Sequence, residues 1–292
     1  MKQYDLHVFS RAPGVYEQKR LIEEASKLGL SIKVMSYMNI HSQLNKDGYK
    51  LYWKDEELVL PKYCIFREPG SDLIYNDIRD TVMRSYLQNN TRVLNSKSLD
   101  RWSGLDKLTQ MGKFQMARLP IFQTSYFGNW GEVFMWARKS DFPIMVKPRL
   151  SSHGVKTHKV ASVKDLEKLS EEIDIREYII QPFMRAGEDL RIIVIGDRAI
   201  GAMKRTAKEG MHITNYSAGG EVSSYDLSGE IEELALKATQ VFDLEYAGVD
   251  LMKNQDGEWC VLEVNRSCQF RGFEKATAMN VASEILCHLT SK

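Results

Sequence analysis

The residues best suited to chemistry lie in one stretch, residues 248–265, which reads GVDLMKNQDGEWCVLEVN. Asp256 and Gly257 are the strongest short hairpin signal in the chain, because a type I′ turn needs positive φ at both central residues. A turn there places Asp250 opposite Glu263, and the alternation of side chains along a strand adds Asn265 to the same face. The opposite face is entirely apolar and is therefore predicted to contact the core. It carries Val249, Leu251, Cys260, Leu262 and Val264.

Two carboxylates that face each other across a β-ladder repel each other and weaken the sheet. A divalent cation reverses the sign of that interaction. Two carboxylates and a side-chain amide oxygen suit a hard ion that keeps several waters and binds phosphate oxygens, which describes Mg²⁺. The residues alone leave a second interpretation open, in which Asp250, Glu263 and Asn265 form a solvated hairpin face.

Three basic residues are candidates for binding an anion. Lys147 ends an apolar strand and could direct a point charge at phosphate oxygens, although a lysine at a strand end is usually solvated. Lys107, near the start of a predicted helix, is a weaker candidate. Arg205 lies at the end of an apolar stripe, and its guanidinium needs an anionic partner, either Glu188 directly opposite or a phosphate or acyl phosphate gripped in bidentate fashion. The stripe consists of Leu190, Ile192, Val194 and Met203.

Two further segments could contact a nucleotide. The loop 149–158, RLSSHGVKTH, lies where a phosphate cradle could form, but its single glycine, Gly154, makes it a poor match to glycine-rich cradles. Residues 181–184, QPFM, end a predicted strand and could line an adenine slot. Phe183 in that segment is more typical of a core position than of a slot lining.

The composition is that of an ordinary soluble protein with two or three packed units. The chain has 292 residues, of which 43% are hydrophobic and 27% are charged. Its 40 basic and 39 acidic residues leave a net charge of +1, which predicts neither a nucleic-acid nor a membrane partner. The four cysteines are scattered, which predicts reduced thiols. A polar N-terminal stretch and the lack of an apolar run of about 18 residues predict a cytoplasmic location.

The first 98 residues predict an α/β unit with a parallel sheet, because a strand, a helix and a second strand open the chain. The predicted elements are strand 4–9, helix 15–28, strand 31–36, a hairpin at 51–60, strand 62–68, helix 72–88 and strand 92–95.

The remaining residues predict two α+β units, 99–182 and 183–292, without a flexible linker between them. The first contains helices 105–117, 128–138 and 163–173 and strands 143–148, 155–160 and 176–183. The second contains a hairpin at 189–205 that turns at Gly196-Asp197, a helix at 229–242, the hairpin at 248–265 and a closing helix at 273–289.

The order and spacing of several motifs make the chain similar to a known family. The chain resembles the ATP-grasp superfamily, and specifically the RimK-type carboxylate–amine ligases, which include enzymes that add glutamate residues to the C-terminus of a ribosomal protein. The likeness covers nearly the whole chain. The motifs are FSRAPGVYEQKRL (9–21), GLDKL (104–108), Lys147, KRTAKEG–N–GG (204–220), AGVDLM (247–252) and VLEVN–S–GFEKAT (261–277).

The resemblance implies roles for the candidate residues. Arg205 would face the transferring phosphoryl group, and Lys147 would assist it. Asp250, Glu263 and Asn265 would hold Mg²⁺, with Mn²⁺ as a substitute. The implied nucleotide contacts are Lys107 and Lys147 for the phosphates, Gln181, Pro182, Phe183 and Met184 for the adenine hinge, Asp189 for the ribose or a nearby substrate, and Asn215.

The sequence departs from the family at four places. Pro182 stands where the family usually has an acidic residue, so the base edge would be read by the backbone of Gln181 and Phe183. The loop 149–158 has less glycine than expected, and Ile213 replaces an arginine. SCQFRG (267–272) replaces a serine-proline-glycine turn, so the residues nearest the acceptor have diverged, and the resemblance does not extend to ribosomal-protein glutamylation.

The expected fold is therefore an α/β (α+β) ATP-grasp fold, in which a parallel-sheet domain precedes two subdomains that sandwich ATP. The expected reaction joins a carboxylate to an amine through an acyl phosphate and releases ADP and phosphate. Two alternatives remain open: a small-molecule kinase on the same fold, and a non-catalytic nucleotide-binding module. The expected partners are ATP, a carboxylate, an amine such as an amino acid or a peptide, and a second copy of the chain in a homo-oligomer.

Overall fold

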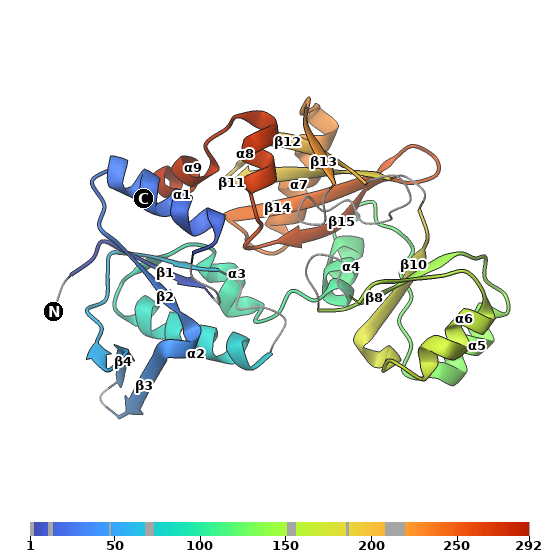
Figure 1. The fold of residues 1–292 in the computed structure, drawn as a ribbon, viewed down its shortest axis with the longest axis horizontal. Coiled ribbons are helices and arrows are strands. Elements are labelled where there is room, and N and C mark those ends of the chain that lie inside the picture. Colours follow the sequence, from blue (N-terminus) through green and yellow to red (C-terminus); the bar gives the residue numbers. More distant parts are fainter. Residues whose placement is uncertain are drawn as a thin grey trace.

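The computed structural model describes residues 3–10, 14–46, 48–67, 73–150, 156–184, 187–207 and 220–291. Four sheets and the helices that cover them are arranged along the long axis of the molecule (Figure 1). One sheet is parallel and three are antiparallel, which confirms the predicted mixed α/β class.

The N-terminal sheet is parallel, with strand order β2-β1-β6-β7. The β-α-β start predicted from the apolar spacing is therefore confirmed. Its strands are β1 (Leu6–Ser10), β2 (Ile32–Ser36), β6 (Tyr63–Phe66) and β7 (Arg92–Val93), and its helices are α1 (Tyr16–Lys27), α2 (Leu73–Gln88), α3 (Ser96–Arg101) and the 3₁₀ turn Tyr37–Asn39.

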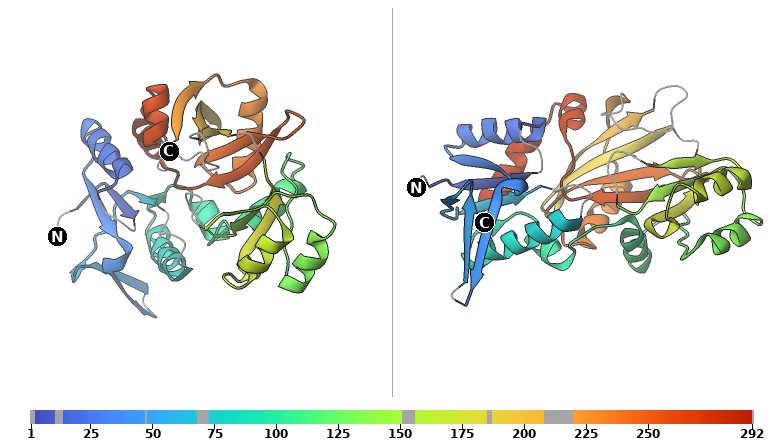
Figure 2. Two further views of the ribbon diagram at one scale, coloured as in Figure 1. Left: turned by 45° about the vertical axis from the view of Figure 1, so that its right-hand side comes forward. Right: turned by 60° about the horizontal axis from the view of Figure 1, so that its bottom comes forward.

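The predicted hairpin at 51–60 is wrong in its limits. A separate antiparallel sheet comprises β3 (Ile40–Asn45), β4 (Gly48–Trp53) and β5 (Glu56–Glu57), and its β3–β4 hairpin projects from the N-terminal unit (Figure 2). The strand β3 was not predicted, because its sequence IHSQLN is largely polar and exposed. A polar strand at an exposed edge lacks the clear apolar alternation that sequence patterns detect.

The middle of the chain forms a small antiparallel sheet of order β10-β8-β9, whose strands overlap those predicted. Its core is made by residues such as Val146, Leu166 and Ile180. The elements are α4 (Lys107–Met116), α5 (Trp130–Ala137), β8 (Ile144–Pro148), β9 (His158–Val160), α6 (Val163–Ser170), the 3₁₀ turn Ile175–Glu177 and β10 (Tyr178–Pro182).

The C-terminal sheet has five antiparallel strands in the order β13-β12-β11-β14-β15. One face packs on α7 and on Met111 and Phe114 of α4, and the other packs on α8, α9 and the N-terminal unit. The elements are β11 (Glu188–Ile195), β12 (Arg198–Thr206), β13 (Glu221–Tyr225), α7 (Gly229–Gln240), β14 (Tyr246–Lys253), β15 (Trp259–Asn265), α8 (Arg271–Thr277) and α9 (Val281–Thr290).

The single closing helix predicted for 273–289 is two helices, α8 and α9. Ala278 takes a left-handed conformation with φ of 58°, which ends α8. Asn280 then caps α9, because its side-chain oxygen accepts a hydrogen bond from the Ser283 backbone nitrogen at 3.1 Å. A left-handed backbone conformation and a side-chain cap thus interrupt an apolar spacing that is typical of one helix.

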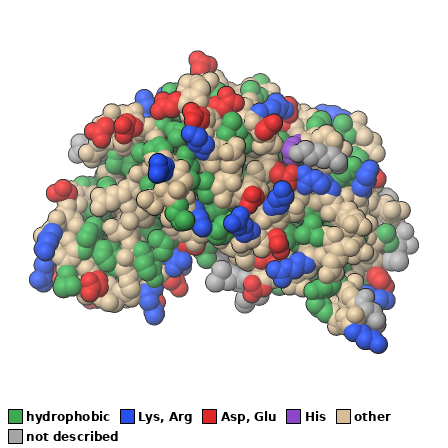
Figure 3. Space-filling view, turned by 180° about the vertical axis from the view of Figure 1, so that it is seen from behind, with side chains coloured by type: hydrophobic (Ala, Val, Ile, Leu, Met, Phe, Trp, Pro, Cys, Tyr) green, Lys and Arg blue, Asp and Glu red, His purple; other side chains and the backbone are tan. Residues whose placement is uncertain are grey.

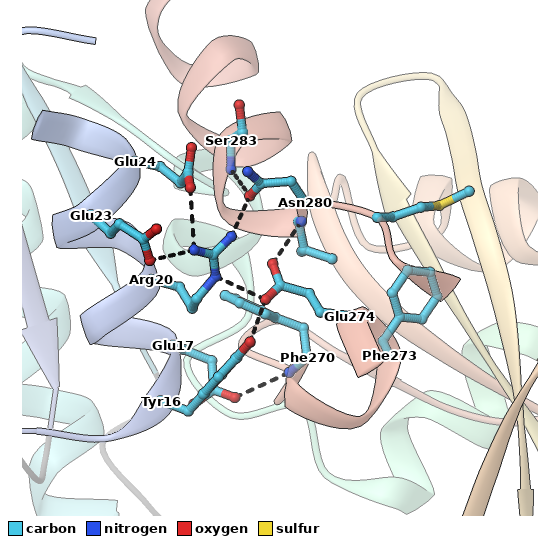
Figure 4. A network of polar contacts seen from close by, with 12 residues as sticks. Tyr16, Glu17, Arg20, Glu23, Glu24, Phe270, Phe273, Glu274, Asn280 and Ser283 are labelled. Atoms are coloured by element: carbon cyan, nitrogen blue, oxygen red, sulfur yellow. Dashed lines mark hydrogen bonds and ion pairs between the residues drawn. The ribbon is translucent and has the colours of Figure 1, made fainter. Parts of the chain in front are cut away.

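A polar network ties α1 to the segment that follows β15 (Figure 4). Arg20 of α1 donates to the Glu274 carboxylate at 3.0 Å, and the Tyr16 hydroxyl donates to the same carboxylate at 2.6 Å. The Phe270 backbone nitrogen donates to Glu17 at 3.1 Å. The N-terminal unit therefore holds in place residues 270–274, which follow β15.

The surface charge is mixed in sign, and the cysteines form no disulfide. Figure 3 shows Lys and Arg side chains interspersed with Asp and Glu over one face, without a large area of one sign. All four cysteines are free thiols. Within the described part of the chain, no helix is long and apolar enough to cross a membrane.

Candidate active site

The β14–β15 hairpin pairs Asp250 with Glu263, the register predicted from the sequence. The route to that register differs from the prediction. Asp256 does not take positive φ, and only Gly257, at 84°, does, so a three-residue turn replaces the type I′ turn. A bulge then shifts the pairing by one residue between Asp250 and Leu251, which returns Asp250 to Glu263.

The bulge also changes which side chains of β15 enter the core. Val249, Leu251 and Val264 are buried in the core under α7, as predicted. Val261 joins them, whereas Leu262, predicted on that face, is only half-buried and lies outside this core. The side-chain alternation of the strand is interrupted at the bulge, so the assignment of Leu262 to the apolar face is wrong.

Asp250 is buried and paired with two arginines. Arg191 lies opposite it on β11 and grips it with two nitrogens, one of them Nη2 at 2.7 Å from Oδ2. Arg205 on β12 reaches the same Oδ2 at 2.9 Å. Gly248 makes room for Arg191, because a Cβ at that position would lie 2.8 Å from the arginine Cδ and 2.7 Å from Cys268 Cβ.

Arg205 does not pair with Glu188, the structural partner that the sequence suggested. A bulge in β12 shifts the β11–β12 ladder by one residue, so Arg205 lies opposite Asp189, and its Nε is 2.5 Å from Asp189 Oδ1. Glu188 instead contacts Lys204 at 3.2 Å. The face predicted for Arg205 is right only for Met203, which lies on the same side of the sheet. Leu190, Ile192 and Val194 pack under α7, on the opposite side of the sheet from the arginine.

Glu263 contacts Lys107 and Asn265. The Lys107 ammonium is 3.2 Å from one carboxylate oxygen, and the Asn265 amide donates to the other at 3.1 Å. Burial opposes ionisation of Glu263, but Lys107, Asn265 and Arg191 outweigh it and lower its pKa to about 2. Asp106 accepts from the Leu108 and Thr109 nitrogens and so fixes the start of α4, where Lys107 lies.

Lys147 lies on the neighbouring subdomain, and its ammonium donates to Gln181 Oε1 at 2.8 Å. Burial lowers the pKa of Lys147 to about 8, and the nearby charge of Lys107 adds to the effect. The Gln181 side chain donates in turn to the Thr124 hydroxyl at 2.8 Å. Burial disfavours the charged form of Lys147, and the nearby ammonium of Lys107 disfavours it further. An anionic ligand would stabilise this pair of lysines.

The described residues of this cluster comprise four cations and three carboxylates: Arg191, Arg205, Lys107 and Lys147 with Asp189, Asp250 and Glu263. The part of the chain that the structure describes contains no group of three or more His, Cys, Asp or Glu side chains placed to hold a metal ion. Each carboxylate is already paired with a lysine or an arginine, so it offers little net negative charge to a divalent cation that arrives without phosphates. A divalent cation bound to phosphates fits better, since carboxylate oxygens keep further lone pairs and the excess cations attract the phosphates.

A family model described as the RimK-like ATP-grasp domain matches residues 126–289, more than half of the chain. The chain belongs to the RimK-like ATP-grasp family. Membership makes it a ligase that forms carbon–nitrogen bonds. A probable alpha-L-glutamate ligase of Aliivibrio fischeri is 29% identical to it over 289 residues, covering 96% of this chain and 93% of the relative.

Solved structures show the same fold. The ATP-grasp ligase PsnB complexed with minimal precursor superposes with a TM-score of 0.77 at 19% identity, covering 99% of each chain. PsnB complexed with a phosphomimetic variant of minimal precursor, Mg and ADP has a TM-score of 0.74 at 18% identity, covering 99% of this chain and 98% of that one. At this level of identity the likeness extends to the fold alone.

The predicted adenine hinge, residues 181–184, has fewer free backbone groups than the sequence suggested. The Phe183 backbone nitrogen donates to the Pro143 carbonyl at 3.1 Å, so it is already engaged, and Pro182 has no N–H. Lys159 lies over the Phe183 ring, 4.0 Å from its centroid. Met184 is half-buried at the end of the segment, and its backbone nitrogen donates to no other described residue.

Some predicted site residues of this family member cannot be placed. Asn215, Ile213 and residues 151–155 of the predicted phosphate loop lie outside the described residues. The sequence reasoning missed Arg191 and Thr124. Arg191 had a detectable signal, because it lies two residues after Asp189 and so shares its face of the strand. Thr124 had none, since its contact with Gln181 joins residues far apart in the sequence.

Proposed function

We propose that this ligase uses ATP to join a carboxylate to an amine through an acyl phosphate, with release of ADP and phosphate. The observation that carries the proposal is the cluster of four cations around the paired Asp250 and Glu263. An excess of buried or half-buried positive charge suits the polyphosphate of a nucleotide and the charge that develops during phosphoryl transfer.

The lysines and the hairpin would bind the nucleotide. Lys107 and Lys147 would contact the phosphates, since they approach the same space from α4 and β8. Asp250, Glu263 and Asn265 would hold Mg²⁺, or Mn²⁺ in its place, once it arrives with the phosphates. The metal ion would supply neutralisation of phosphate charge.

Arg205 would face the transferring phosphoryl group. Asp189 and Asp250 hold its guanidinium from two sides, so its position is fixed before any substrate binds. A donor that needs no reorganisation during the reaction stabilises the transition state most effectively. Arg191 would keep Asp250 in place through its two contacts with that carboxylate.

The proposed chemistry needs no side-chain nucleophile. A carboxylate oxygen of the substrate attacks the γ-phosphorus, and the bond to the ADP oxygen breaks. The amine nitrogen then attacks the carbonyl carbon of the acyl phosphate, the carbon–oxygen bond to phosphate breaks, and the nitrogen loses a proton. The products are an amide, ADP and inorganic phosphate.

The relatives indicate the substrate class. One relative is named a probable alpha-L-glutamate ligase, and PsnB was solved with a precursor. We therefore propose that the amine belongs to an amino acid such as glutamate and that the carboxylate belongs to a peptide, a protein or a small molecule. The divergent segment 267–272 supports an acceptor other than a ribosomal protein.

The test incubates the protein with ATP, Mg²⁺, glutamate and a panel of peptides, followed by mass spectrometry and phosphate assay. Amide with phosphate supports the ligase, a stable phosphorylated product would show the kinase, and bound but unchanged ATP would show the binding module. Glu263→Gln should lose turnover. Glu258→Gln is the matched control, because this exposed residue lies on the same hairpin away from the cluster.

A further inference from the structure

A chain of three hydrogen bonds runs from a backbone carbonyl to the Lys147 ammonium. The Thr124 hydroxyl donates to the Phe122 carbonyl at 2.9 Å, and the Gln181 amide nitrogen donates to the Thr124 oxygen at 2.8 Å. The Lys147 ammonium donates to Gln181 Oε1 at 2.8 Å. Gln181 is buried, so each of its polar atoms needs such a partner.

The chain has one direction. A threonine hydroxyl has a single hydrogen, and here the Phe122 carbonyl, which can only accept, takes it. Thr124 can therefore only accept from Gln181, so the amide nitrogen of Gln181 faces Thr124 and its oxygen faces Lys147. An ammonium can only donate, which makes that orientation the one that Lys147 needs.

The contact limits where the Lys147 ammonium can lie. Lysine has a long flexible stem, and a hydrogen bond at its tip selects one of many side-chain conformations. Among the described residues, Gln181 is its only hydrogen-bond partner, which leaves further N–H groups for a ligand. Lys107 lies close enough to lower the pKa of Lys147, so the Lys147 ammonium is held near the rest of the cation cluster.

We propose that Thr124 is a positioning residue for nucleotide binding, which acts by orienting the Gln181 amide so that Gln181 holds the Lys147 ammonium toward the phosphates. The inference rests on the proposed role of Lys147 in the function above. The backbone supports a clean test, because Ser125 and Ile180 exchange two hydrogen bonds of 2.9 Å. Those bonds keep Thr124 beside Gln181 whatever side chain position 124 carries.

The test compares Thr124→Val, which keeps the shape and loses the hydroxyl, with Thr124→Ser, which keeps the hydroxyl. One readout is the affinity for Mg·ADP by calorimetry. The other is the rate at which acetic anhydride acetylates Lys147 in the nucleotide-free protein, measured by mass spectrometry. We expect Thr124→Val to weaken Mg·ADP binding about tenfold, the scale of a hydrogen bond to a charged group, and to change the acetylation rate. Thr124→Ser should behave as wild type.

A second comparison tests whether Thr124 acts through Gln181. Gln181→Met removes the acceptor of the lysine, so adding Thr124→Val to it should cause no further loss of affinity. Additive losses would overturn the inference. So would a Thr124→Val protein that lowers the unfolding temperature but leaves the Mg·ADP affinity and the acetylation of Lys147 unchanged, because that result shows a purely structural role.

Lys147→Met separates this inference from the proposed function. If Lys147→Met weakens Mg·ADP binding and Thr124→Val does not, the inference about Thr124 is wrong and the role of Lys147 stands. If Lys147→Met leaves Mg·ADP binding unchanged, the proposed role of Lys147 itself is wrong, and the inference that depends on it is wrong as well.

Discussion

Glu263→Gln decides between two accounts of the paired strands. From the sequence, removing a carboxylate that faces Asp250 relieves repulsion and stabilises the metal-free protein. The structure predicts the opposite, because Lys107 lies 3.2 Å from Glu263 and the charge of Asp250 is already matched by Arg191 and Arg205. Losing the Glu263 charge leaves Lys107 beside Lys147 with less compensation.

The pKa of Glu263 sets the size of the expected loss in the free energy of unfolding. It falls from 4.5 to about 2, so the charged carboxylate stabilises the fold fully above pH 4.5 and loses that contribution as the pH falls toward 2. At about 1.4 kcal/mol for each pKa unit, the contribution is at most about 3–4 kcal/mol. The side chain is 24% exposed, and solvent screening reduces the expected loss in Glu263→Gln to roughly 1–3 kcal/mol at pH 7.

The assay is urea unfolding at pH 7 in the presence of EDTA. With a slope of about 3 kcal/mol per molar urea, the midpoint of Glu263→Gln should fall by roughly 0.3–1 M. The control Glu258→Gln, exposed on the same hairpin, should stay within about 0.5 kcal/mol of wild type. A Glu263→Gln midpoint equal to or above that of wild type would refute the reasoning, because it would show that repulsion between Asp250 and Glu263 outweighs the attraction of Lys107.

Three further predictions follow from burial and backbone chemistry. Burial and Lys107 lower the pKa of Lys147 to about 8, so Mg·ADP affinity by calorimetry should fall between pH 7 and pH 9 as its charge is lost, and should fall less steeply in Lys147→Met. Burial, with help from Lys33, lowers the pKa of His7 to about 4, so its imidazole stays neutral in the folded protein while the unfolded chain takes up a proton below pH 6.5. Urea unfolding should show wild type losing up to about 3 kcal/mol more than His7→Gln between pH 6.5 and pH 4. With Pro182 in the hinge, kcat/KM should favour ATP over GTP by less than about 10⁴-fold, the scale of buried polar recognition, and a larger preference would contradict backbone readout of the base.

Most strands could be predicted from the sequence, although β3 and β13 were missed, whereas exact register could not. Alternation located β14 and β15, and the turn predicted at Asp256 and Gly257 gave the pairing of Asp250 with Glu263. Bulges are invisible to that pattern, because they insert one residue without changing the apolar composition of a strand. One bulge moved Arg205 from Glu188 to Asp189, and another, together with the three-residue turn, left Asp250 and Glu263 in their predicted pairing.

Most charged residues of the cluster could be predicted, although Arg191 was missed, whereas their partners could not. Lys107, Lys147 and Arg205 stood out by type and position, and the structure brings all three to the same cluster. Their contacts join distant parts of the chain, as between Lys107 on α4 and Glu263 on β15. Such contacts depend on how subdomains pack, and local patterns carry no information about that packing.

The most direct test of the central claim follows the oxygen atoms of the carboxylate. A peptide substrate found in the panel is labelled with ¹⁸O in its reacting carboxylate and incubated with ATP, Mg²⁺ and glutamate, and the phosphate released is analysed by mass spectrometry. Activation through an acyl phosphate predicts one ¹⁸O atom in inorganic phosphate for each amide formed. Amide formation with unlabelled phosphate, or with ¹⁸O in AMP, would contradict it.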